Sequence, residues 1–433
     1  MGEPFTLTPA RWIGLPGGAV PAGAFALFRT EFDLSELPEK AEGWILTGTR
    51  YRLWVNGRRV QWGPAPADPA GPEADSVDLR PLLQKGENAI GIEVLGDASG
   101  APDLIVRLSL GEQTLDTGWG TWWVYADHHP LDSRRHPHGW KRGGFRPGAG
   151  WDHARELAAP SALGVAPRSI PLMKEEIVRG ATLIDRGTVS DELSLILRRD
   201  QRRTKMETLR LTESGDLFFI FELPDVVVGW PQITIDAPAG TEVELSTSES
   251  LASDHPWRPG GRDPVWCWTS RGVEEAIEPF EFETFRRMRV RIRQAVPGIT
   301  IRAVGARRRW SDFPGTALLR TDDEGLQAVF DASLRSLINS AQDALFDARV
   351  VELRQTAGDG SHGLHPVRTI FGGVAHARRF LTTFATGQVA SGLWRDAWPP
   401  PATVPASIAS PLSSSSTADF FDFEKGLSLE MPK

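Results

Sequence analysis

The hydrophobic period of this 433-residue chain changes near residue 321, and this change limits the folds open to it. Before that point, apolar residues recur at every second position in short runs, which is typical of half-buried strands. After it, they recur every three or four residues, which is typical of an amphipathic helix. The sequence therefore predicts a β-rich region to about residue 310, followed by a helical region.

Residues 24–110 are predicted to form a jelly-roll-like β-sandwich. Residues 51–55 alternate and lead into Asn56 and Gly57, a pair that favours a two-residue type I′ hairpin. The alternation recurs at Ile90, Ile92 and Val94, and at Leu104, Val106, Leu108 and Leu110. Residues 63–75 are rich in proline, alanine and glycine, which predicts a long surface loop.

Residues 112–170 are dense in tryptophan, histidine, glycine and proline and show no sustained period. The chain has 16 Trp but only 2 Tyr. Tryptophan suits stacking on sugar rings and equally suits the core of a large sandwich, so the sequence leaves both open. One histidine cluster has a spacing that matches no familiar metal site, so we expect no metal or other cofactor; it comprises His128, His129, His136 and His138.

A second β-sandwich is predicted between about residues 171 and 310. Met288, Val290 and Ile292 alternate with a row of arginines formed by Arg287, Arg289, Arg291 and Arg293. The row fits an anionic ligand, but a solvated face or an interface with an acidic neighbour is the favoured prediction. The charge run 307–309 is expected to be solvated. The aromatic loop 251–270 either lines a sugar site or packs between domains.

The helical region is predicted to begin with a capping box of Thr321 and Glu324. Its apolar face comprises Leu326, Val329, Phe330, Leu334, Leu337, Ile338, Ala341 and Leu345. Gly358 and Gly360 break the pattern. A second helix is expected from about Pro366 to Ala385, with Gly387 ending it, and the Pro- and Ser-rich segment from Trp398 onward is expected to be poorly ordered.

The net charge of −8 argues against nucleic acid or an anionic membrane as a partner. Cys267 is the single cysteine, so no disulfide can form within the chain. The first residues lack the pattern of a secretory signal, and no apolar run approaches the ~18 residues of a membrane span. These features predict a cytoplasmic protein, with a homo-oligomer as a possible state.

Three carboxylates, Asp347, Glu352 and Asp359, lie in the stretch 343–360 between the two predicted helices. Glycosidic bond cleavage uses two carboxyl groups, one to protonate the leaving oxygen and one to activate water or attack the sugar. Loops at the mouth of a helical barrel are natural places for such a site. Acidic residues are also common on any solvated loop, so the spacing alone leaves both interpretations open.

Three stretches resemble the bacterial α-L-rhamnosidases of glycoside hydrolase family 78. The first is Tyr51-Arg-Leu-Trp-Val-Asn-Gly57 with Gly63-Pro64-Ala65, similar to the family's N-terminal sandwich hairpin. The second joins Gly229-Trp230, Ala239-Gly240-Thr241, Ser248-Glu249 and the Phe280-to-Arg289 strand. The third is the acidic stretch, where Asp347, Glu352 and Gly358-Asp359 match the family's spacing without a gap. The likeness covers roughly residues 10 to 400.

The resemblance implies inverting hydrolysis of terminal α-L-rhamnosides, so a rhamnose-containing glycoside is the expected partner. It assigns Glu352 as the general acid, Asp347 and Asp359 to holding sugar hydroxyls, and Arg354 to substrate binding. It also implies two sandwiches followed by an (α/α)6 six-hairpin barrel. The expected domains are 1–170, 171–315 and the start of the barrel at 316–398, with a tail at 399–433.

The chain departs from the family pattern in two ways. The family's general base lies far downstream, and only 112 residues follow Thr321, too few for twelve helices. The residues usually flanking the acid are replaced by Arg349, Val351, Leu353 and Thr356. We therefore expect weak or no activity. Two alternatives stay open: a non-catalytic carbohydrate-binding protein, and a truncated frame whose tail after about Pro401 is not native.

Overall fold

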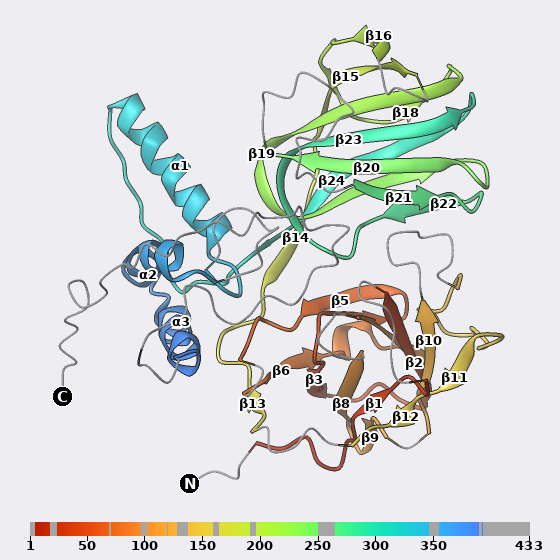
Figure 1. The fold of residues 1–433 in the computed structure, drawn as a ribbon, viewed down its shortest axis with the longest axis vertical. Coiled ribbons are helices and arrows are strands. Elements are labelled where there is room, and N and C mark those ends of the chain that lie inside the picture. Colours follow the sequence, from red (N-terminus) through yellow and green to blue (C-terminus); the bar gives the residue numbers. More distant parts are fainter. Residues whose placement is uncertain are drawn as a thin grey trace.

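The computed structural model describes most of the chain, apart from several short gaps and the C-terminal end (Figure 1). The described residues are 5–17, 24–68, 71–96, 102–118, 120–127, 137–158, 164–190, 196–249, 265–345, 355–388 and 392. Figure 1 shows two β-rich units, one above the other, with the helices beside the junction between them. We call these parts the N-terminal sandwich (strands β1–β13), the large sheet (β14–β24) and the helical segment (residues 324–386).

Two sheets face each other in the N-terminal sandwich. One has the order β12-β1-β8-β3-β6-β13, with β9 on β8; its strands are β1 (Ile13–Gly14), β3 (Ala41–Leu46), β6 (Glu73–Asp78), β8 (Asp103–Leu110), β9 (Gln113–Asp116), β12 (Arg155–Glu156) and β13 (Ala166–Pro167). The other has the order β11-β10-β2-β7-β4-β5; its strands are β2 (Phe25–Leu34), β4 (Tyr51–Val55), β5 (Arg58–Gly63), β7 (Gly86–Leu95), β10 (Trp123–Asp127) and β11 (Trp151–His153). A single 3-10 turn, η1 (Arg80–Leu82), precedes β7 within the described ranges.

The alternation seen in the sequence produces the core of this sandwich. Ile90, Ile92 and Val94 of β7 pack in one cluster with Val106 and Leu108 of β8, from the opposite sheet. Because successive side chains of a strand point to opposite faces, this set lines the space between the sheets. The predicted sandwich is thus present between residues 24 and 110.

The hairpin between β4 and β5 has the predicted turn. Asn56 and Gly57 have φ angles of 50° and 76°, the left-handed pair that a type I′ turn requires. The loop that follows β5 differs from its prediction as a surface loop. Ala65 is buried, and so are Ala74 and Asp75 where the loop enters β6.

The large sheet is one continuous hydrogen-bonded sheet. Its main path is β14-β24-β19-β23-β20-β21. The strands are β14 (Lys174–Val178), β15 (Thr182–Val189), β16 (Ile196–Asp200), β17 (Thr204–Lys205), β18 (Leu209–Arg210), β19 (Gly215–Asp236), β20 (Glu242–Ser248), β21 (Val265–Thr269), β22 (Glu274–Ile277), β23 (Glu283–Ala295) and β24 (Thr300–Trp310).

Strand β19 connects the two halves of this sheet. Its first half pairs with β15, and its second half pairs with β22 and β24. Its pairing with β23 shifts register between Glu222 and Val227. Apolar residues from both halves, such as Phe221 and Ile235, belong to one buried cluster. A sheet that bends back over its own core in this way gives the sandwich-like second unit expected from the sequence.

The arginine row of β23 lies on neither a solvated face nor an acidic domain interface. Arg289 and Arg291 are buried, and carboxylates of neighbouring strands in the same sheet lie beside the row. The pairs are Arg287 with Glu222 at 3.2 Å, Arg291 with Asp216, and Arg293 with Glu244. The favoured prediction was wrong because the carboxylates come from strands distant in sequence.

The charge run 307–309 is likewise not simply solvated. Arg307 pairs with Glu278 at 3.0 Å and Arg308 with Glu176 at 3.6 Å. Arg309 is only 1% exposed, although it lies on the same face of β24 as Arg307. Alternation along the strand places these two arginines on the same face, so contacts with Trp62 and Asp343, and not alternation, bury Arg309.

The helical segment contains α1 (Glu324–Ser340), α2 (Ala357–Phe371) and α3 (Val374–Thr386) within the described residues. The predicted capping box is wrong, because the N-cap of α1 is Asp323, whose Oδ1 accepts from the N–H of Leu326 at 3.0 Å. Thr321 Oγ1 instead accepts from the N–H of Asp323. These three helices do not form a barrel in the part of the chain that the structure describes.

The second predicted helix proved to be two. Helix α2 ends at Gly372, whose φ of 65° is left-handed, and α3 begins directly afterwards. Pro366 lies inside α2 rather than at its start, and Gly387 is the C-cap of α3, as predicted. Asp359 consequently lies in the first turn of α2, not on an irregular connection between helices.

The helices share a small apolar core of their own. Val367, Phe371, Phe380 and Phe384 are buried together with partly buried side chains from the C-terminal half of α1. The N-terminal half of α1 projects away from α2, and its Leu326 and Val329 are exposed (Figure 1). Among the described helices, none combines the length and apolarity that a bilayer span would require.

Candidate functional site

The predicted site residues are only partly described. Asp347, Glu352 and Arg354 lie outside the described residues. For Asp359 the structure gives the backbone, which lies in the first turn of α2. The structure therefore describes the acidic stretch only at its two ends. One end is residues 343–345, after α1, and the other begins at Gln355, before α2.

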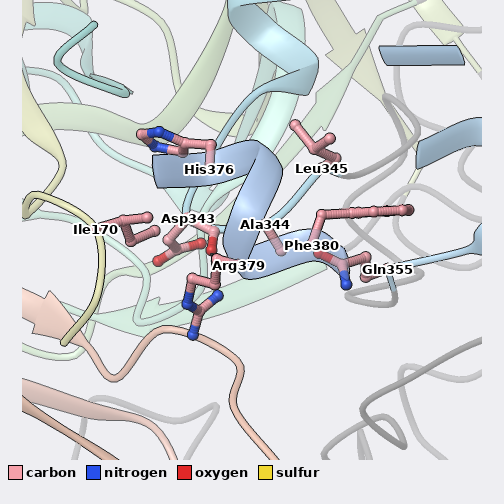
Figure 2. Close-up of a pocket in the computed structure, with 8 residues that line it drawn as sticks. All are labelled: Ile170, Asp343, Ala344, Leu345, Gln355, His376, Arg379 and Phe380. Carbon is pink, nitrogen blue, oxygen red and sulfur yellow. Dashed lines mark hydrogen bonds between the residues drawn. The ribbon is translucent and has the colours of Figure 1, made fainter. Parts of the chain in front are cut away.

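Both ends of the stretch line one small cavity against α3 (Figure 2). The lining residues are Ile170, Asp343, Ala344, Leu345, Gln355, His376, Arg379 and Phe380. Its volume is about 10 Å³, close to the minimum that one water molecule needs and far too small for a sugar ring. This cavity is not itself a substrate pocket, but it brings the two ends of the acidic stretch against the same helix.

Asp343 is held by buried guanidinium groups. Arg309 Nη2 donates to Asp343 Oδ2 at 2.7 Å, and both side chains are 1% exposed. Arg168 lies 4.0 Å from the same oxygen. Burial opposes ionisation of Asp343, but Arg309 and Arg168 outweigh it and hold its pKa below the ordinary value. Asp343 therefore stays a carboxylate and cannot serve as the proton donor of the stretch.

Arg309 reaches Asp343 through a cage of aromatic rings. Its guanidinium carbon lies 4.1 Å from the ring centre of Phe282, 5.1 Å from that of Trp62 and 5.6 Å from that of Trp230. The face of each ring attracts the cation, and the rings exclude water from the ion pair. Trp62 belongs to β5 of the N-terminal sandwich, so both β units form the cage.

Arg379 of α3 ties the helical segment to the N-terminal sandwich. It donates to the backbone oxygen of Pro66 at 2.6 Å, to the carboxylate of Glu73 at 2.9 Å and to the backbone oxygen of Asp343 at 2.9 Å. Figure 2 shows Arg379 and Asp343 on the same side of α3. The loop predicted to lie on the surface thus supplies docking contacts for the helices.

A second chain of hydrogen bonds leads from the sandwich toward Asp343. Gln61 donates to the hydroxyl of Tyr51 at 2.5 Å, and that hydroxyl donates to Asp75 at 2.6 Å. Arg168 donates to the other oxygen of Asp75 at 3.0 Å, so it lies between the two carboxylates. Burial raises the pKa of Asp75, whereas Arg168 acts in the opposite direction.

His376 completes the junction. Its ring is stacked obliquely on Phe313 at 4.7 Å, and it lines the cavity with Asp343 and Arg379. Burial, together with the positive charges of Arg379 and Arg168, lowers the pKa of His376 to about 4. The imidazole is therefore neutral at neutral pH.

The structure narrows two interpretations that the sequence left open. Every described tryptophan is buried or half-buried, so those residues serve as core and interface rather than as open sugar platforms. Of the histidine cluster, only His138 is described, and its Nδ1 lies 3.3 Å from Arg271. The described residues contain no group of three or more His, Cys, Asp or Glu that could hold a metal ion.

The junction residues were not found from the sequence. Arg168, Arg309 and Arg379 are far apart in the chain, and no spacing links them to Asp343. Strand alternation gives no signal either, because it places Arg307 and Arg309 on the same face of β24, although only Arg309 is fully buried. Their convergence depends on how the three parts pack together.

Comparisons with known proteins give a fold but no sequence family. No protein-family model matches the sequence, and no curated protein matches it either. The fold is similar to that of a GH78 family rhamnosidase of Bacillus sp. GL1, with a TM-score of 0.74 and 14% identity over 92% of this chain and 65% of that chain. It is also similar to an α-L-rhamnosidase from Dictyoglumus thermophilum, with a TM-score of 0.65 and 17% identity over 90% of this chain and 45% of that chain.

A third similar structure is a Streptomyces avermitilis α-L-rhamnosidase complexed with L-rhamnose. Its TM-score is 0.62 and its identity 19%, over 87% of this chain and 37% of that chain. This chain therefore spans less than two-thirds of the length of each of these chains. At such identities the likeness establishes a shared fold: over about nine-tenths of its length, the chain is folded like parts of α-L-rhamnosidases.

Proposed function

We propose that this chain is related in function to the α-L-rhamnosidases, whose reaction would be inverting hydrolysis of terminal α-L-rhamnosides. The observation that carries the proposal is the fold similarity along about nine-tenths of the chain. The acidic stretch adds support, because in the sequence it follows two β-rich units and helix α1, which is the order that the family resemblance implies. A rhamnose-containing glycoside is the proposed partner, and one of the similar structures is complexed with L-rhamnose.

The proposed roles follow from the chemistry of glycoside cleavage. Glu352 would protonate the leaving glycosidic oxygen, while Asp347, Asp359 and Arg354 would bind sugar hydroxyls. An inverting enzyme also needs a carboxylate about 6.5–9.5 Å from the acid, to activate water on the opposite face of the sugar. Asp343 is a poor candidate for acid or base, because two arginines hold it as a buried, ion-paired carboxylate.

For the chain as given we propose weak or no hydrolysis. The resemblance supplies no residue in this sequence for the general base, and the helices α1–α3 would be the first of an (α/α)6 barrel. Without a base, water attack loses the ~100-fold or greater contribution that general base catalysis typically makes.

Hydrolysis of an aryl α-L-rhamnoside tests this proposal. We expect Glu352→Gln to abolish any turnover above the uncatalysed rate, because an amide cannot donate the proton. Glu207→Gln is the matched control, since Glu207 is an exposed residue between β17 and β18, far from the acidic stretch in sequence. Turnover at rates typical of enzymes would contradict the weak activity. Turnover above the uncatalysed rate that is equal in both variants would contradict the role of Glu352.

The alternative is a non-catalytic carbohydrate-binding protein. The burial of the described tryptophans weighs against it, because a stacking platform must be open to the sugar. A titration with L-rhamnose that follows tryptophan fluorescence separates the two functions. Binding that persists in Glu352→Gln without any turnover in the wild type would favour the alternative.

A further inference from the structure

Helix α3 has one buried face and one exposed face. Phe380 and Phe384 of the buried face belong to the apolar core of the helical segment. On the exposed face, Val374 is 52% exposed and Leu381 is 36% exposed, and Arg378 between them is exposed as well. These three positions are four and three residues apart, so their side chains are neighbours on the helix surface. We call this apolar patch with a central cation the α3 face.

The positive charge of the α3 face is open to a partner. Helix α3 contains two arginines and no acidic residue. Arg379 is paired with Glu73, whereas Arg378 forms no ion pair in the part of the chain that the structure describes. A guanidinium group beside aliphatic side chains suits a partner that combines carboxylates with apolar groups.

One segment of this chain has that chemistry. Residues 419–424, which lie outside the described residues, have the sequence Asp-Phe-Phe-Asp-Phe-Glu. Residues 387–418 separate this segment from the end of α3. A flexible chain of that length has a root-mean-square span of about 30 Å. Because a helix as long as α3 measures about 20 Å, the segment can reach every part of the α3 face.

We propose that the α3 face is the docking surface for residues 419–424 of the same chain. The phenylalanines would contact Val374 and Leu381, and the carboxylates would lie beside Arg378. A linked segment binds at a high effective concentration, so a small contact area suffices. A second copy of the chain suits the α3 face less well, because a two-fold contact would place Arg378 of both copies together. The docking does not depend on the proposed hydrolase activity.

A second exposed apolar surface, on the N-terminal half of α1, suits this segment less well. Leu326 and Val329 are exposed there. The exposed residues 322–324 at the same end of the helix are all acidic. They would repel the carboxylates of residues 419–424. The distribution of charge therefore favours the α3 face.

Site-specific photocrosslinking in the full chain tests the docking. The photoreactive residue p-benzoylphenylalanine replaces Phe421, and the adducts are located by mass spectrometry after irradiation at low ionic strength. We expect adducts on residues 374–385 of the same chain, and a lower yield at high salt because exposed ion pairs are screened. Arg378→Glu should reduce the yield several-fold. Adding Asp422→Arg to Arg378→Glu should restore part of it, because the two charges are then exchanged.

The matched control is Arg58→Glu, which makes the same change of charge at an exposed arginine of β5. It should leave the yield of adducts on α3 unchanged. Equal losses in Arg378→Glu and Arg58→Glu would overturn the proposal, as would an absence of adducts on α3. Adducts mainly on α1 would also overturn it, and adducts between two chains would make a second copy the partner instead.

Discussion

At the residue scale, Asp343 and Arg309 connect the three parts of the molecule. Arg309 comes from the large sheet, its aromatic cage includes Trp62 of the N-terminal sandwich, and Asp343 follows α1. Both partners are almost completely buried, so their pairing offsets a large desolvation cost. The removal of one partner leaves the other as an uncompensated charge.

We expect Asp343→Asn to lower the free energy of unfolding by about 3–5 kcal/mol, because Arg309 and Arg168 would lose their shared carboxylate. The measurement is urea denaturation at neutral pH. The matched control is Asp225→Asn, which removes the exposed pair with Arg335 and should cost about 0–1 kcal/mol. Equal losses of unfolding free energy in the two variants would show that the buried pair stabilises the protein no more than the exposed pair does.

At the element scale, α2 is a helix that contains several glycines. Gly358, Gly360 and Gly363 lie in its first half, and two of them were interpreted from the sequence as a break. A Cβ added to Gly360 would lie 2.2 Å from the ring of Phe380, whereas one added to Gly363 would meet nothing within 4 Å. Gly360 is thus explained by the close packing of α3 against α2, which the sequence does not reveal.

The same substitution should therefore have opposite effects at these two positions. Gly360→Ala should destabilise the protein by about 1–3 kcal/mol, because α3 must move away from α2. Gly363→Ala should stabilise it by up to about 1 kcal/mol, because alanine has the higher helix propensity and room for its methyl group. Thermal unfolding followed by circular dichroism measures both. Stabilisation by Gly360→Ala would show that the helices are not packed this closely.

At the scale of the whole molecule, the two β units are joined by a buried charge network around Glu278. Arg59 of β5 contacts it directly, Arg307 of β24 lies at 3.0 Å and Arg52 of β4 at 3.7 Å. Burial opposes ionisation of Glu278, but these arginines outweigh it and lower its pKa to about 2. The interface therefore depends on an ionised Glu278.

The lowered pKa has a defined effect on acid stability. In the unfolded protein Glu278 has its ordinary pKa near 4.5. Its contribution to the free energy of unfolding is therefore complete above pH 4.5 and is lost as the pH falls toward 2. We expect Glu278→Gln to cost about 3 kcal/mol at pH 7 and to flatten the pH dependence of stability between 4.5 and 2. Urea denaturation across this range is the measurement. Glu42→Gln, which removes an exposed ion pair with Lys40, is the control and should cost about 0–1 kcal/mol.

Some features were predictable because they depend on neighbours in the sequence. The type I′ turn at Asn56 and Gly57, the alternating strands β7 and β8, and the end of α3 at Gly387 all follow from local backbone and side-chain preferences. The start of α2 and the N-cap of α1 were mispredicted although they are also local. For α2, Gly358 and Gly360 indicated a break where the helix in fact begins. For α1, the Thr321 motif predicted an N-cap that is in fact Asp323.

The candidate site likewise has features that depend on sequence order and features that depend on packing. The sequence by itself determined two β-rich parts followed by helices, and the spacing of Asp347, Glu352 and Asp359, because each depends on periodicity or on order along the chain. Only the tertiary structure decided which charges are buried and paired. Arg168, Arg309 and Arg379 meet Asp343 across separations of 34 residues or more, and periodicity carries no information at that range.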